Sequence, residues 1–128
     1  MKGKNRNIKI SQVYDINNII AADLEARKGK QFNYGVLRFD KRREYYIQKI
    51  HKSIKDGTYH TGKVTFERRF CDKKFRILSK VHYYDHVAHH ALMRVIMPVI
   101  HKSYYNESAA SIKGRGIHYL LKHMKKFV

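Results

Sequence analysis

The amino-acid sequence predicts an α+β fold in which helices pack around one small antiparallel β-hairpin. Two observations predict this class. Apolar residues recur at helical spacing over most of the chain, and the spacing changes to strict alternation in one short segment, residues 64–78. The length of 128 residues suits one ordinary domain. We therefore expect a basic N-terminal extension over residues 1–10 and a single domain over residues 11–128.

Two helices are expected in the first half of the chain. Asp15 is placed to cap the first, and Gly29 offers its C-terminal stop. The apolar residues of this helix are Ile16, Ile19, Ile20 and Leu24. Asp40 is expected to begin the second helix, and Gly57 to end it. The apolar stripe of the second helix consists of Ile47, Ile50 and Ile54.

The β-hairpin is predicted from alternating side chains. Val64, Phe66 and Arg68 fall on one face of a strand, whereas Thr65, Glu67 and Arg69 fall on the other. Residues 72–74 form a polar turn, and residues 75–78 resume the alternation. We therefore expect a hairpin with basic residues at its tip.

Helical spacing returns at Asp85. The broad apolar face of this helix consists of Val87, Ala88, Ala91, Leu92, Val95 and Ile96. Pro98 is expected to break or kink the helix, or to begin a new one. After a loop, a last helix is expected to carry Ile117, Leu120, Leu121 and Met124.

The net charge points to a polyanionic partner. The chain has 28 Lys and Arg against 10 Asp and Glu, a formal net charge of +18. Solubility alone needs a net charge of only about 2–8 in a small domain. Nucleic acid, an anionic membrane surface or an acidic protein would each suit such an excess.

The sequence contains no sorting signal that we recognise. Cys71 is the only cysteine, so neither an internal disulfide nor a zinc site built on paired cysteines is expected. No apolar segment follows the N-terminus as in a signal peptide, and no stretch approaches a membrane span. A cytoplasmic protein without membrane contact is therefore expected.

Catalytic constellations are not evident. The aspartates and glutamates are scattered, so no catalytic residue and no metal ligand is predicted. His86, His89 and His90 lie on one helix, but zinc would need further ligands, and we favour surface histidines. Three adjacent tyrosine pairs could stack on bases, although we expect most of these rings to pack in the core.

The segment 112–118 is the strongest local candidate for ligand binding. Gly114 and Gly116 permit a close backbone approach, Lys113 and Arg115 add charge, and a helix N-terminus follows. A glycine-containing turn with solvated charges explains the same residues equally well.

Several segments, taken in order, resemble the N-terminal fingers region of bacterial reverse transcriptases of the group II intron, retron and diversity-generating retroelement type. They are Asp56-Gly57-Thr58-Tyr59, Lys74-Phe75-Arg76-Ile77, Asp85-His86, Ala91-Leu92, Pro98 and the segment Ser108 to His118. The resemblance covers roughly residues 20–128. Departures from the family's pattern are His86 and Ile112 in place of Arg, and Ala109 and Ser111 in place of aromatic residues.

The resemblance implies a fingers subdomain of an RNA-directed DNA polymerase, with the palm and its catalytic carboxylates absent. Lys74 and Arg76 would bind the phosphates of the incoming deoxynucleotide triphosphate. The residues that would hold the RNA template are Lys113, Gly114, Arg115, Gly116 and His118. The implied partners are an RNA template and an RNA–DNA duplex. The chain itself would bind no cofactor and be inactive alone, and Mg²⁺ would belong to the complete enzyme.

Two alternatives remain open at the level of sequence. One is a stand-alone, non-catalytic RNA-binding protein of a phage or mobile element. The other is a metal-dependent nuclease that uses His86, His89 or His90. A fingers module without its palm would also expose apolar surface, so self-association is a third question.

Overall fold

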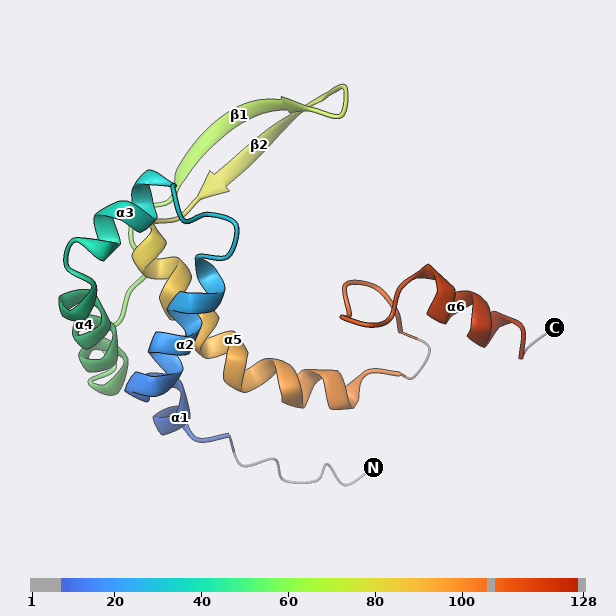
Figure 1. Ribbon diagram of the computed structural model, residues 1–128, viewed down its shortest axis with the longest axis horizontal. Helices are drawn as coiled ribbons and strands as arrows, with labels where there is room; N and C mark the ends of the chain where they lie inside the picture. The colour runs from blue at the N-terminus through green and yellow to red at the C-terminus, as the bar shows by residue number, and fades with distance from the viewer. Residues whose placement is uncertain (1–7, 106–107, 127–128) are drawn as a thin grey trace. The chain divides into compact units, whose positions relative to one another are not determined.

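The computed structural model describes residues 8–105 and 108–126 and confirms the α+β class (Figure 1). The described residues form six helices and one two-stranded antiparallel sheet. The chain divides into two compact units, Met1–Met97 and Pro98–Val128. Within the described ranges, no helix combines the length and the apolar character that a membrane span requires.

The core of the first unit is built by four helices. It draws on α2 (Ile16–Ala26), α3 (Tyr34–Asp40), α4 (Arg43–Lys55) and the first turns of α5 (Tyr83–Ser103), while the short α1 (Ile10–Tyr14) adds the buried Val13. The buried side chains of the main cluster are Ile19, Ala22, Ala26, Phe39, Ile47, Ile50, Val87, Ala88 and Ala91. These are largely the residues whose spacing predicted helices, because burial of one apolar face stabilises each helix.

Two predicted helix boundaries are confirmed. Asp15 caps α2, since its Oδ2 accepts a hydrogen bond of 3.3 Å from the Asn18 N–H. Gly57 ends α4 with a φ of +70°. The Gly57 N–H donates to the Ile54 carbonyl at 3.2 Å, and the Thr58 N–H donates to the Ser53 carbonyl at 2.9 Å. This pair of bonds is the Schellman motif, which glycine favours because it adopts positive φ without strain.

The prediction that Asp40 begins the second helix was wrong. Asp40 is the last residue of α3, and α4 begins three residues later, at Arg43. A carboxylate at a helix C-terminus opposes the helix dipole. Here the opposition is offset because Asp40 Oδ1 lies 2.9 Å from the Arg27 guanidinium. The position of Asp40 at the end of α3 is therefore stabilised by its contact with Arg27, which is thirteen positions away in the sequence.

A buried carboxylate, Asp23, joins α2 to α4 and α5. Its oxygens accept hydrogen bonds from Arg27 at 2.7 Å, from Arg43 at 2.8 Å and from the Tyr83 hydroxyl at 2.7 Å. Burial by itself raises the pKa of Asp23, but the hydrogen bonds from Arg27, Tyr83 and Arg43 outweigh it, so the net pKa is lowered. The site therefore holds an ionised carboxylate although Asp23 is fully buried.

The second unit contains the expected last helix, α6 (Ile117–Met124). The apolar residues of α6 are all exposed: Ile117 70%, Leu120 40%, Leu121 48% and Met124 56%. The boundary between the units falls at Pro98, inside α5. Pro98 does not end that helix, although its lack of an N–H removes one backbone hydrogen bond.

Replacement of Asp23 by Asn should destabilise the fold by about 3 kcal/mol at pH 7, because two arginines would lose their buried counter-charge. The folded pKa of Asp23 is depressed, so its stabilisation is present above the ordinary pKa and is lost as the pH falls through the folded pKa. The difference between the variant and the wild type should thus shrink below about pH 4. Urea unfolding at several pH values measures this difference in the free energy of unfolding. The exposed Asp56→Asn is the control, and a difference that is independent of pH would contradict the assignment.

Candidate nucleic-acid interface

The predicted β-hairpin is confirmed, and it has a two-residue turn. Strands β1 (Thr65–Cys71) and β2 (Lys74–Lys80) pair antiparallel, with Cys71 opposite Lys74. The turn residues Asp72 and Lys73 have φ values of +50° and +61°. Two successive positive φ values give the turn that matches the right-handed twist of paired strands. Aspartate tolerates this conformation, whereas lysine adopts it at a cost.

The hairpin has two different faces. In the register Arg69 pairs with Arg76, and Arg68 pairs with Ile77. Directly opposite residues share a face, and alternate residues along a strand return to it. We call one side the basic face; its residues are Thr65, Glu67, Arg69, Cys71, Lys74, Arg76, Leu78 and Lys80. We call the other side the aromatic face; its residues are Phe66, Arg68, Phe70, Phe75, Ile77 and Ser79.

Lys74 and Arg76, the expected phosphate ligands, lie on the basic face two residues apart. The Arg76 Nη2 atom is 3.2 Å from Asp72 Oδ2, and the two side chains are 55% and 82% exposed. An ion pair this exposed is worth little, so a phosphate can replace the carboxylate at small cost. Both cations are therefore accessible to a ligand.

One carboxylate stands among the cations of the basic face. Glu67 pairs with Arg69 at 3.3 Å and with Lys80 through its other oxygen. The face thus carries four cations, which are Arg69, Lys74, Arg76 and Lys80, against this single acid. In the turn, Asp72 and Lys73 balance each other. The excess of positive charge is therefore local to one side of the hairpin.

A second buried carboxylate anchors the base of the hairpin. Asp85, at the start of α5, is 2% exposed. Its Oδ1 accepts from the Tyr59 hydroxyl at 2.8 Å, and its Oδ2 accepts from the Gly62 N–H at 3.1 Å. Burial, followed by the hydrogen bond to Asp85, raises the pKa of Tyr59. The segment that leads into β1 is thereby fastened to α5, and two segments that carry the family resemblance contact each other.

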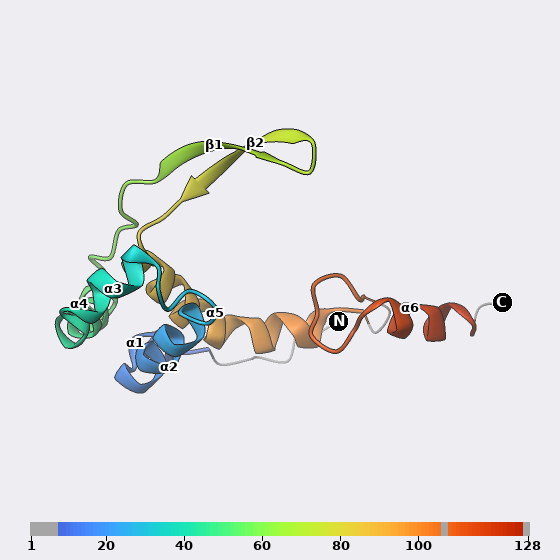
Figure 2. The same cartoon turned by 45° about the horizontal axis from the view of Figure 1, so that its top comes forward.

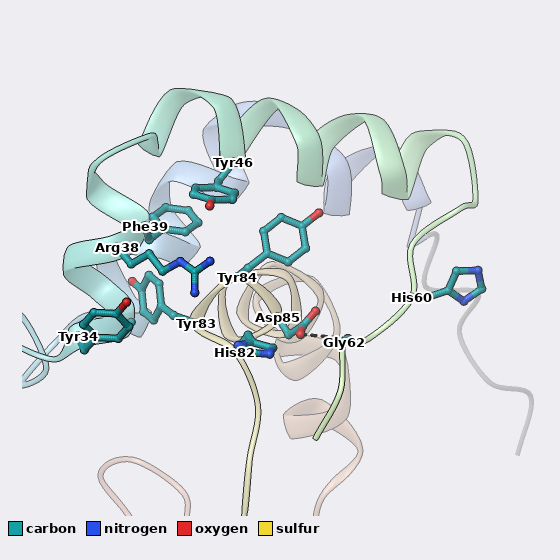
Figure 3. A pocket seen from close by; sticks show the side chains of 11 residues that line it. Tyr34, Arg38, Phe39, Tyr46, His60, Gly62, His82, Tyr83, Tyr84 and Asp85 are labelled. Carbon is teal, nitrogen blue, oxygen red and sulfur yellow. Dashed lines mark hydrogen bonds between the residues drawn. The ribbon is translucent and has the colours of Figure 1, made fainter. Parts of the chain in front are cut away.

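A pocket of about 540 Å³ lies beside this anchor (Figure 3). Its wall is mainly aromatic, and the residues that line it are Tyr34, Gly35, Arg38, Phe39, Tyr46, His60, Gly62, His82, Tyr83, Tyr84 and Asp85. Figure 3 shows the Arg38 guanidinium pointing into the space between Tyr46, Tyr83 and Tyr84. The Phe39 ring stacks on Tyr46 with centroids 5.2 Å apart, so the two rings pack together in this part of the wall.

The histidines of α5 lie close together. The rings of His86 and His90 have centroids 6.4 Å apart. Burial lowers the pKa of His86, and the charge of Lys30 lowers it further. Across residues 8–105 and 108–126, no group of three or more His, Cys, Asp or Glu side chains is placed to hold a metal ion.

The glycine-containing segment of the second unit uses its arginine internally. The Arg115 Nη1 atom donates to the carbonyls of Tyr105 at 3.3 Å and Ser108 at 3.1 Å, and the guanidinium lies 5.2 Å from the Tyr119 ring centroid. Arg115 therefore fastens its own loop, a role that the sequence did not predict. Gly114 has a φ of +81°, which only glycine adopts without strain. The other expected template ligands, Lys113, Gly114, Gly116 and His118, are exposed.

The expected ligand residues thus belong to two separate groups. Lys74 and Arg76 are brought together by the hairpin of the first unit. The segment 113–118 belongs to the second unit, where Arg115 holds it in place. Each group is organised by local contacts of its own unit.

No protein-family model matches the chain, and no curated protein gives a significant match. The function of the chain is therefore inferred from its residues and their geometry.

Sequence reasoning missed α3 and the residues that it contributes to the pocket. Tyr34 and Arg38 line the pocket from this helix. The signal was present, since Asn33 precedes a segment in which Val36 and Phe39 have helical spacing and are buried. The hydrogen bond between Tyr59 and Asp85 had no local signal, because it joins residues 26 positions apart.

Replacement of Lys73 by Gly should stabilise the hairpin by about 1 kcal/mol, because glycine adopts the positive φ of this position without strain. Amide hydrogen exchange in β1 and β2 measures the effect as slower exchange. The neighbouring Lys74→Gly, which removes a side chain from a regular strand position, should instead speed exchange. Equal effects of the two changes would contradict the assigned turn.

Replacement of Tyr59 by Phe should destabilise the base of the hairpin by about 1–2 kcal/mol, because the buried Asp85 carboxylate would lose one of its two donors. Exchange of the amides around residue 62 and urea unfolding would both report the loss. The matched control is Tyr45→Phe, since Tyr45 is 57% exposed. If Tyr59→Phe and Tyr45→Phe lower the free energy of unfolding equally, the hydrogen bond between Tyr59 and Asp85 does not stabilise the base of the hairpin.

Proposed function

We propose that this chain binds RNA or an RNA–DNA duplex as the fingers portion of an RNA-directed DNA polymerase. In this proposal the basic face of the hairpin contacts phosphates, with Lys74 and Arg76 directed at the phosphates of an incoming nucleotide. The exposed part of segment 113–118 contacts the template, and Arg115 keeps that segment in shape.

The observation that carries the proposal is the placement of Lys74 and Arg76 at alternate positions of an exposed strand, on a face with two further cations. Alternate residues of a strand are about 6.6 Å apart. Arginine offers a planar fork of donors to phosphate oxygens, and lysine offers a compact charge. Two such groups on one face of a strand can hold neighbouring phosphate oxygens at the same time.

The anchor at the hairpin base gives independent support. The resemblance to the fingers region depends on separate short segments, two of which are Gly57-Thr58-Tyr59 and Asp85-His86. Tyr59 and Asp85 are hydrogen-bonded at 2.8 Å. Segments that are matched only in sequence order thus also pack against each other, which is what a shared fold requires.

The proposal predicts strongly salt-dependent binding. An interface that uses about six phosphates should lose about a thousandfold in affinity for an RNA–DNA duplex between 50 and 200 mM salt. The double variant Lys74→Ala, Arg76→Ala should weaken binding and lower the slope of log affinity against log salt by about two. Fluorescence anisotropy of a labelled duplex measures both quantities.

The control variant removes the same charge elsewhere. Lys52 and Lys55 are exposed on α4, away from either face of the hairpin. Lys52→Ala, Lys55→Ala should leave most of the salt slope unchanged. A flat titration of the wild type, or an equal loss in the two double variants, would defeat the proposal.

A further inference from the structure

The aromatic face of the hairpin is exposed to an unusual degree. Its large apolar side chains and their exposed fractions are Phe66 72%, Phe70 60%, Phe75 65% and Ile77 74%. In both views the hairpin extends away from the helices of the first unit (Figures 1 and 2). Clustered apolar groups of this kind on a soluble protein mark a binding surface. A two-stranded hairpin is only marginally stable alone, so a ligand on this face would also stabilise it.

The charges around this face indicate what covers it. Arg68 is the only ionisable residue of the aromatic face, and its guanidinium lies 4.4 Å from the Phe75 ring centroid. The opposite face has four cations and one acid. A purely apolar protein partner would bury the Arg68 charge without a counter-ion, at a considerable cost in desolvation. A polyanion that also carries flat apolar groups suits both features at once.

Nucleic acid has that chemistry, and its unpaired form has it most fully. Bases in a duplex are stacked on each other and present only their edges. Unpaired bases offer their faces to aromatic side chains, while their phosphates meet nearby Lys and Arg. Phe66 and Phe70 are four residues apart on one strand, roughly 13 Å, so the face can receive more than one base.

We propose that the aromatic face binds single-stranded nucleic acid by stacking of unpaired bases on Phe66, Phe70 and Phe75, with Arg68 on the same face meeting a phosphate of that strand. This inference rests on the proposed function and deepens it, because it assigns duplex phosphates and an unpaired strand to opposite sides of one hairpin. Every base has an aromatic face, so we expect little sequence preference.

The first experiment separates stacking from charge. Affinities are measured at 150 mM salt for three labelled ligands of equal length: oligo(U), an abasic single strand and an RNA–DNA duplex. The variant Phe66→Leu, Phe75→Leu keeps the face apolar but removes two rings. It should lose about tenfold or more in affinity for oligo(U), with little change for the abasic strand or the duplex. The control is Phe32→Leu, which replaces a 91% exposed ring outside the hairpin and should bind like the wild type.

The second experiment does not depend on a loss of binding. The chain has no tryptophan, so Phe75→Trp introduces a single fluorophore on the aromatic face. Oligo(U) should quench its emission at saturation, whereas the abasic strand should not. Amide spectra of each variant show whether the hairpin is formed. They therefore distinguish the loss of a stacking ring from the unfolding of the hairpin.

Each negative result has a defined meaning. Equal quenching by both single strands, or an unchanged oligo(U) affinity in the double Phe variant, overturns the stacking proposal. If the same variant instead converts an oligomer to a monomer without affecting oligo(U) binding, the face pairs with a second copy of the chain and the proposal also fails. These outcomes leave a steep salt dependence for the duplex intact, so they are distinguishable from a failure of the proposed function.

Discussion

The hydrogen bonds of the buried Asp85 carboxylate determine where the hairpin leaves the helical part of the first unit. One oxygen accepts a hydrogen bond from the Tyr59 hydroxyl and the other accepts one from the Gly62 N–H. The segment that joins α4 to β1 is therefore fastened to α5 at two residues. A Cβ atom at Gly62 would lie 3.0 Å from Asp85 Oδ2, which explains why glycine suits this position. The hairpin itself has few contacts beyond its own strands. The Asp85 anchor, the nearby contact between Thr61 and His89 at 3.4 Å, and the short link from β2 to α5 therefore position the hairpin.

Acidic and basic residues are distributed unevenly between the interior and the surface. Asp23 and Asp85 are buried and satisfied by hydrogen bonds, the first among two arginines and a tyrosine, the second between a hydroxyl and a backbone N–H. Burial of carboxylates removes negative charge from the surface of a chain that already has a large cationic excess. Asp23 neutralises Arg27 and Arg43 beside it, so part of the cationic excess is also compensated inside the fold.

Three tyrosines pack inside the first unit, whereas three phenylalanines of the hairpin do not. Tyrosine, with its hydroxyl, is the ring that usually bridges core and water. Here Tyr59 and Tyr83 use their hydroxyls to satisfy buried carboxylates, and Tyr46 stacks on Phe39 inside the first unit. The phenylalanines of the hairpin, which have no polar group, are by contrast largely exposed. These exposed rings contribute little to the core of the first unit and are the basis of the stacking proposal.

The sequence alone determined those features that arise from contacts between near neighbours in the chain. The Asp15 cap, the glycine stop at Gly57 and the alternation of the hairpin each follow from residues within a few positions of one another. The tertiary structure decided the roles of Asp23, Asp40 and Asp85. Each of these carboxylates is settled by partners 13 or more positions away, such as Arg43 for Asp23 and Tyr59 for Asp85. A carboxylate that caps a helix and one that is buried in an ion pair look identical in sequence, because the difference lies in which distant side chains the fold brings within hydrogen-bonding distance.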